Sequence, residues 1–167
     1  MRKLKNILIT GGAGFIGSNF IHYLFGQSSA KGDLFNDAGF TGTVVNVDCL
    51  TYAGNLESLK DIEEKFGGTR YFFEKVDICD RDNIERVFKQ YDIDTVIHFA
   101  AESHVDRSIL GPEAFMKTNV MGTFTLLDVA RNYWKKDDGT IRDDVLFHHI
   151  STDEVYGSLG ETGYFRE

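Results

Sequence analysis

The chain has 167 residues, of which 42% are hydrophobic, and a net charge of −8 at pH 7. This length suits one domain over residues 1–167, and the acidic balance argues against binding to nucleic acid or anionic membranes. The chain contains no apolar run long enough to span a membrane, and its two cysteines lack metal-ligand spacing, so we expect a cytoplasmic protein with reduced thiols and no metal.

The first predicted element is a strand that includes the apolar residues 7–9, followed by a glycine turn and a helix over residues 15–25. Gly11, Gly14 and Gly17 lie between the end of the strand and the first turn of the helix, which is the arrangement that a dinucleotide site requires. Glycine lets the backbone approach a pyrophosphate closely, and a helix N-terminus offers free N–H groups to it. This context disfavours the alternative of a glycine turn without a ligand.

A long loop over residues 26–42 leads to a β-branched strand over residues 43–47, which ends at Asp48. A carboxylate at this point can accept hydrogen bonds from both ribose hydroxyls of adenosine, and it repels the 2′-phosphate of NADP. The position therefore favours NAD. The gap between Gly17 and Asp48 exceeds the usual ~20 residues because of the long loop.

Strands are further predicted over residues 71–76, 95–99 and 145–150, and helices over residues 55–66, from Asp80 onward, and over 111–132. Their alternation predicts a doubly wound parallel sheet of the Rossmann type with strand order 3-2-1-4-5. The helix after Asp80 should bury Ile84, Val87 and Phe88. The apolar side of the long helix is expected to carry Phe115, Met116, Val120, Phe124, Leu127 and Ala130.

Ligands bind at the carboxyl ends of the strands in such sheets, and two polar stretches follow strands there, over residues 100–108 and 151–157. Asp153 and Glu154 are adjacent carboxylates, which resist ionising together and can supply an acid and a base. An ordinary acidic turn is the alternative. His104 is the histidine expected in the site, whereas His98, His148 and His149 should be core or sheet-surface residues, and Tyr133 and Trp134 should be packing residues.

Six motifs in order closely resemble the dTDP-glucose 4,6-dehydratase family, within the extended short-chain dehydrogenases/reductases. They are GGAGFIG at 11–17, DCLTYAGNLESL at 48–59, DICD at 77–80, HFAAESHVDRS at 98–108, NVMGT at 119–123 and HHISTDEVYG at 148–157. The last block is the specific one, because related sugar-nucleotide epimerases share the glycine motif but usually lack the Asp-Glu pair.

The resemblance implies a lyase that oxidises C4 of dTDP-glucose with NAD+, eliminates water across C5 and C6, and returns the hydride to C6. By analogy Glu154 removes the C5 proton, Asp153 protonates the departing hydroxyl, and Thr152 holds the C4 oxygen. Substrate binding would involve Ser103, His104 and Thr152. Cofactor contacts would come from Gly11, Gly14, Phe15, Ile16 and Gly17 at the pyrophosphate, Asp48, Cys49, Leu50 and Thr51 at the ribose, Asp77 and Ile78 at the adenine, and Ala100, Ala101, Glu102, Ser103 and Thr118 at the nicotinamide.

One family motif, a helical Tyr-x-x-x-Lys pair, does not follow Glu154. The spacing occurs at Tyr71 and Lys75, but a strand would hold those side chains ~13 Å apart. We therefore interpret the sequence as an N-terminal portion without the catalytic helix, remaining strands and substrate domain. It is expected to be inactive alone and to bind NAD weakly, while the full-length protein forms a homodimer. Alternatives are a nucleotide-sugar epimerase or decarboxylase, and a non-catalytic NAD-binding module.

Overall fold

The computed structural model describes residues 4–26, 40–157, 160 and 162–164. Its centre is a sheet of five parallel strands in the order β3-β2-β1-β4-β5, which confirms the predicted topology. Most of the predicted 26–42 loop lies outside the described residues. The strands are β1 (Asn6–Thr10), β2 (Thr43–Val47), β3 (Tyr71–Glu74), β4 (Thr95–His98) and β5 (Leu146–His149).

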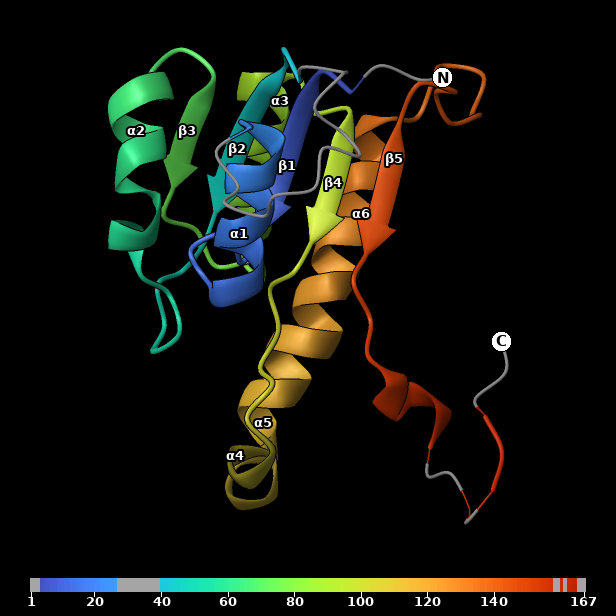
Figure 1. Cartoon of the computed structure of the whole chain (residues 1–167). Coiled ribbons are helices and arrows are strands. Elements are labelled where there is room, and N and C mark those ends of the chain that lie inside the picture. The colour runs from blue at the N-terminus through green and yellow to red at the C-terminus, as the bar shows by residue number, and fades with distance from the viewer. Residues whose placement is uncertain (1–3, 27–39, 158–159, 161, 165–167) are drawn as a thin grey trace.

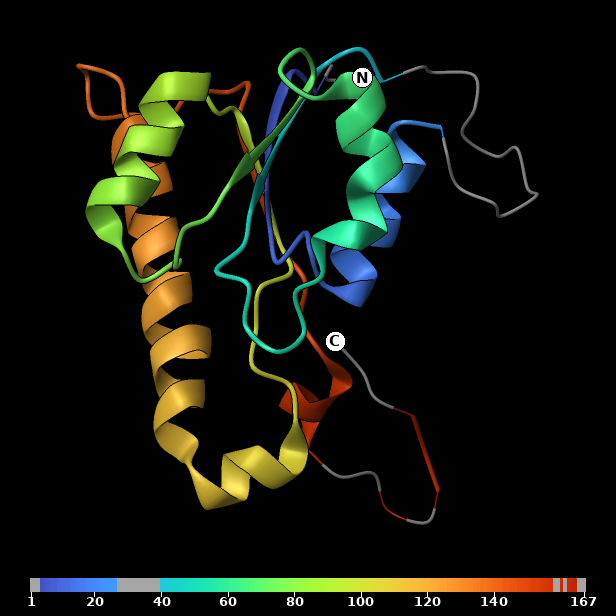
Figure 2. The same cartoon turned by 90° about the vertical axis from the view of Figure 1, so that its left-hand side faces the viewer.

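Helices cover both faces of the sheet, so the molecule has three layers (Figures 1 and 2). In Figure 2, α1 and α2 lie on one side of the sheet and α3 and α6 on the other. The predicted 55–66 helix begins as a 3₁₀ turn. The helical segments are α1 (Phe15–Leu24), η1 (Leu56–Leu59), α2 (Lys60–Phe66), α3 (Arg81–Tyr91), α4 (Val105–Leu110), α5 (Pro112–Phe115), η2 (Met116–Gly122), α6 (Thr123–Tyr133) and η3 (Asp153–Tyr156).

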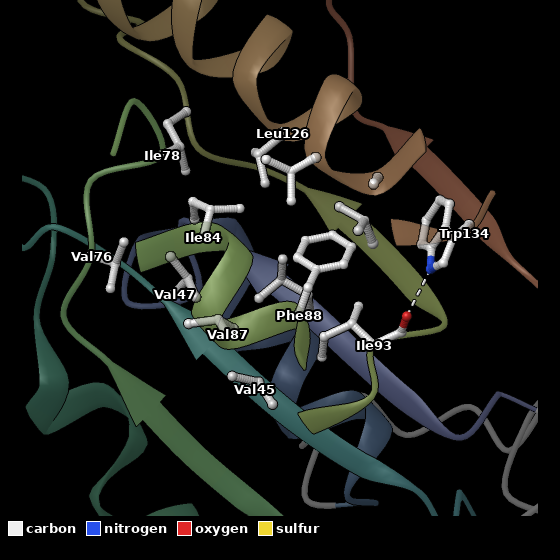
Figure 3. Packing of buried hydrophobic residues seen from close by; sticks show 14 residues of the cluster. Val45, Val47, Val76, Ile78, Ile84, Val87, Phe88, Ile93, Leu126 and Trp134 are labelled. Carbon is white, nitrogen blue, oxygen red and sulfur yellow. Dashed lines mark hydrogen bonds between the residues drawn. The ribbon is translucent and has the colours of Figure 1, made fainter. Parts of the chain in front are cut away.

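The central strands are buried on both faces, as their continuous apolar sequences predict. Side chains alternate along each strand, so that Leu8 packs with the α3–α6 layer and Ile7 with the α1–α2 layer. Figure 3 shows the first of these two cores, in which the Phe88 ring lies 5.9 Å from that of Trp134. The Trp134 indole N–H donates to the carbonyl of Ile93 at 2.7 Å, which satisfies both buried groups.

The start and the buried side of α3 follow directly from local sequence. The Asp80 carboxylate accepts a hydrogen bond from the Asn83 N–H at 3.2 Å and caps the helix, as predicted. Ile84, Val87 and Phe88 are fully buried, which confirms the predicted apolar side.

The predicted apolar side of the long helix is wrong for Met116, Val120, Phe124 and Leu127, which are between 46% and 58% exposed. The helix is built of α5, the π-helical η2 and α6. Its buried side carries Gly122, Thr125, Leu126, Val129 and Ala130.

Close packing explains why the other side of this helix faces the sheet. A Cβ at Gly122 would lie 2.5 Å from the Ile78 side chain, so a larger residue could approach this closely only if the Ile78 side chain moved. The apolar residues left outside, Met116, Val120, Met121, Phe124 and Leu127, form what we call the exposed stripe. In the described part of the chain, no helix is long and apolar enough to cross a membrane.

Candidate cofactor and active site

The glycine turn between β1 and α1 lies at the carboxyl end of the central strand. Gly11 has a φ of +68°, and a Cβ there would lie 2.7 Å from the backbone nitrogen of Ala100. A Cβ at Gly17 would lie 2.3 Å from the carbonyl oxygen of Gly11. Both positions therefore require glycine for close backbone contact.

The N-terminus of α1 faces this turn. Gly14 is the N-cap, and among the residues that the structure describes no side chain caps this helix end. Phe15 and Ile16 are exposed although they are large and apolar. An uncapped helix N-terminus above a tight glycine turn fits the pyrophosphate of a dinucleotide, because the phosphate oxygens can accept from the free N–H groups.

Asp48 follows β2 and braces the neighbouring backbone. One carboxylate oxygen accepts from the Ala13 N–H at 3.0 Å and the other from the Leu50 N–H at 2.8 Å. An ionised carboxylate has about four acceptor positions, so the two bonds leave capacity for ribose hydroxyls. The same side chain thus ties the glycine turn to the loop after β2.

Asp77 follows β3, and its carboxylate interacts with a backbone N–H donor and with a lysine ammonium. Its carboxylate accepts from the Cys79 N–H at 2.9 Å and pairs with the Lys117 ammonium at 3.4 Å. Burial by itself would raise the pKa of Asp77, but these bonds hold it below its ordinary value. Burial and the charges of Asp48 and Asp77 raise the pKa of the Cys49 thiol, in agreement with its predicted lack of nucleophilic character.

The segment after β4 is fastened to the π-helical η2. The Asn119 side chain accepts from the Glu102 N–H at 2.8 Å and donates to the Glu102 carbonyl at 2.9 Å. The amide therefore binds this stretch of backbone as a neighbouring strand would. It fixes the 100–103 segment opposite the glycine turn.

These segments surround a cleft of about 520 Å³. Every residue predicted to contact the cofactor lines it except Leu50, which instead donates its N–H to Asp48. Sequence reasoning missed Lys117, Ala53 and Gly54, which also line it. A hollow of about 630 Å³ lies beside β3, between α2 and Tyr91, but it contains no predicted site residue, so volume alone does not identify the site.

The predicted catalytic residues are less completely assembled. Ser103 lines the cleft, whereas Thr152 and His104 are exposed outside its lining. Asp153 and Glu154 begin η3, and their side chains lie outside the description. Ile150, at the end of β5, lines the cleft, so the chain leaves the sheet beside it and continues into the Thr152–Glu154 segment.

Other predictions for polar and aromatic residues can be compared with the structure. His98 is buried and Trp134 packs in the core, as expected. Tyr71 is buried in β3, where its hydroxyl accepts from Asn46 at 2.9 Å and burial raises its pKa to about 12. This environment agrees with the interpretation of the Tyr71–Lys75 spacing as chance. In the parts of the chain that are described, no cluster of three or more ligand-type side chains could hold a metal ion.

Comparisons with known proteins identify the family of the chain. The profile of the family described as GDP-mannose 4,6 dehydratase matches residues 8–167. A curated dTDP-glucose 4,6-dehydratase from Salmonella typhimurium is 54% identical over 153 residues, which are 92% of this chain and 38% of that protein. The chain thus spans less than half the length of the curated relatives it matches.

Two solved structures extend the comparison. A dTDP-glucose 4,6-dehydratase from Bacillus anthracis in complex with NAD is 40% identical with a TM-score of 0.72, covering 98% of this chain and 42% of that one. A UDP-glucose 4-epimerase from Thermotoga maritima with UDP-glucose is 31% identical with a TM-score of 0.60, and the match covers 77% of this chain and 34% of the epimerase.

Proposed function

The chain belongs to the GDP-mannose 4,6-dehydratase family, and we propose that it is the cofactor-binding part of an NAD-dependent dTDP-glucose 4,6-dehydratase. The observation that carries the proposal is the cleft, because residues from the ends of β1, β2, β3 and β4 line one hollow that suits a dinucleotide. The similarity to dTDP-glucose dehydratases over almost the whole chain supports the choice of reaction.

Within this proposal the cleft residues divide the cofactor between them. The glycine turn and the N-terminus of α1 bind the pyrophosphate, while Asp48 accepts from the adenosine ribose and selects NAD over NADP. Asp77 and Ile78 contact the adenine. The nicotinamide lies against the 100–103 segment and Thr118, which Asn119 and η2 hold in place.

The substrate lies beyond the nicotinamide, beside the end of β5. When bound, NAD+ supplies the temporary oxidation at C4 that makes the C5 proton acidic. Glu154 then takes that proton, Asp153 gives one to the leaving C6 hydroxyl, and Thr152 holds the C4 oxygen. Ser103 and His104 bind the sugar. Two carboxylates of opposite protonation suit this elimination, because it needs a base and an acid together.

The cofactor half of the proposal is tested by titrating the 167-residue chain with NAD+ in a calorimeter. We expect Asp48→Ala to weaken binding about 10–100-fold, since hydrogen bonds to a charged acceptor contribute about 1.5–3 kcal/mol. Asp143→Ala removes the same charge from a side chain that is 98% exposed and should leave the affinity unchanged. Equal affinities for the wild type and Asp48→Ala would contradict the assignment.

The reaction is tested by grafting this chain in place of the matching segment of the Salmonella typhimurium relative. Mass spectrometry of dTDP-glucose treated with the graft should show a product lighter by one water. Glu154→Gln in the graft should abolish that product. Epimerisation of a nucleotide sugar without water loss would favour the epimerase alternative, and NAD+ binding without turnover would favour a binding module.

We also propose that a second copy of the chain covers the exposed stripe, as the expected homodimer requires. Phe124 is 54% exposed near the middle of the stripe, so Phe124→Glu places a charge where the copies would meet. Light scattering of the graft into the Salmonella typhimurium relative should report a dimer with the wild-type segment and a monomer with this variant. Gln90→Glu, on the surface of α3, is the control and should remain dimeric. A monomeric wild type would overturn this proposal.

A further inference from the structure

The glycine turn, the 100–103 segment and η2 form three walls of the cleft. The buried imidazole of His98 links residues that adjoin these walls, and we infer that it is a positioning residue that holds the three walls in place while its ring is neutral. Its Nδ1 lies 2.6 Å from the Thr10 hydroxyl, and its Nε2 lies 2.9 Å from the Thr123 hydroxyl. The Ala100 N–H donates to the same Thr10 hydroxyl at 3.3 Å. The inference rests on the proposed cofactor site, since it concerns the walls of that site.

These bonds matter because of where the partners stand in the chain. Thr10 directly precedes Gly11, and Gly11 packs against the backbone of Ala100 with no room for a Cβ. Thr123 is the first residue of α6 and directly follows η2, which carries Thr118 and Asn119. A displacement of the imidazole would therefore disturb the glycine turn, the 100–103 segment and the π-helical wall together.

The three hydrogen bonds around His98 form a chain in which the Ala100 N–H, the Thr10 hydroxyl and the His98 ring each donate once. The Ala100 N–H donates to the Thr10 hydroxyl, that hydroxyl donates to Nδ1 of His98, and the Nε2–H donates to Thr123. This order needs one ring proton, on Nε2. A second proton on Nδ1 would turn the acceptor into a donor and break the bond from Thr10.

The surroundings keep the ring uncharged. His98 is 1% exposed, and its described ring neighbours on β5 are His149 at 5.0 Å and Phe147 at 6.3 Å, of which only His149 can titrate. Its other described partners, Thr10 on β1 and Thr123 on α6, are hydroxyls. Burial, with the nearby His149 ring, lowers the pKa of His98 to about 4.

The first experiment measures NAD+ affinity of the chain with three substitutions. His98→Phe keeps an aromatic ring without polar atoms, and Thr123→Val keeps the shape without the hydroxyl, so each should weaken binding about tenfold or more. His98→Gln can accept from Thr10 and donate to Thr123, so it should recover most of the loss. Thr125→Val, a buried threonine on the same helix, is the control. Unchanged affinity in both His98→Phe and Thr123→Val would overturn the inference.

A second experiment does not depend on cofactor binding. Long-range ¹H–¹⁵N correlation spectra of the full chain should show the His98 ring as the neutral Nε2–H tautomer at pH 7 and still at pH 5. A ring that carries its proton on Nδ1, or titrates near 6.5 like an unburied histidine, would refute the arrangement. If the wild type binds no NAD+ but this spectrum is as expected, the proposed cofactor site fails while the hydrogen-bonded positioning of the three walls stands.

Discussion

Replacing Gly17 with alanine is expected to reduce NAD+ affinity by a factor of about 100 or more. The added Cβ would lie 2.3 Å from the Gly11 oxygen and 2.7 Å from the Gly12 Cα, and backbone atoms cannot turn aside as a flexible side chain can. The turn must therefore open, which moves the N-terminus of α1 away from the position proposed for the pyrophosphate. Misplacement of about 1 Å in a binding site costs factors of this size. Calorimetric titration of the chain measures the effect.

The control for this substitution is Gly160→Ala. Among the residues that the structure describes, none places a heavy atom within 4 Å of a Cβ added at Gly160, and Gly160 does not require a positive φ, so its replacement should leave both affinity and stability unchanged. Urea unfolding of Gly17→Ala separates a local change from global loss of structure. If folded Gly17→Ala bound NAD+ as tightly as the wild type, the glycine turn would not be the pyrophosphate site.

The second large effect is expected from Phe88→Ala. Phe88 is fully buried between the sheet and α6, and its ring contacts those of Tyr133 and Trp134 at centroid distances of 5.6 and 5.9 Å. Truncation leaves a cavity that the surrounding rings can fill only in part. The free energy of unfolding should fall by about 3–5 kcal/mol, as measured by urea denaturation.

Lys89→Ala serves as the neighbouring control on α3. The Lys89 side chain is 67% exposed and forms an ion pair with Glu85 at 3.4 Å, so its loss should change the free energy of unfolding by at most about 0.5 kcal/mol. A change below about 1 kcal/mol for Phe88→Ala would mean that the α3–α6 core is much looser than the contacts in Figure 3 indicate.

The contrast between α3 and the long helix explains how far sequence alone can predict this fold. In α3, a capping aspartate fixes the start of the helix and a single apolar side fixes which residues are buried. Asp80 caps the helix and Ile84 and Phe88 are buried, as predicted. The long helix has apolar residues on two sides. The choice between them depends on Gly122 meeting Ile78, a contact between segments far apart in sequence that no local pattern contains.

The same distinction applies to the site. The residues predicted from strand ends and family motifs to contact the cofactor line one cleft, apart from Leu50, because parallel strands bring their carboxyl ends to one edge. Lys117 was missed, since only the folded chain places its ammonium beside Asp77. The predicted core character of His98 is confirmed, but its link from Thr10 to Thr123 depends on the pairing of three distant elements.

The position of β1 between β2 and β4 has a consequence for how the molecule forms. Thr10 and His98, opposite one another in the β1–β4 pair, are 88 residues apart in the chain. Joining such distant segments carries a loop-closure entropy that later contacts must offset, so parallel sheets of this kind reach the native state slowly. The cleft needs the ends of both strands, so it cannot form before the centre of the sheet has closed.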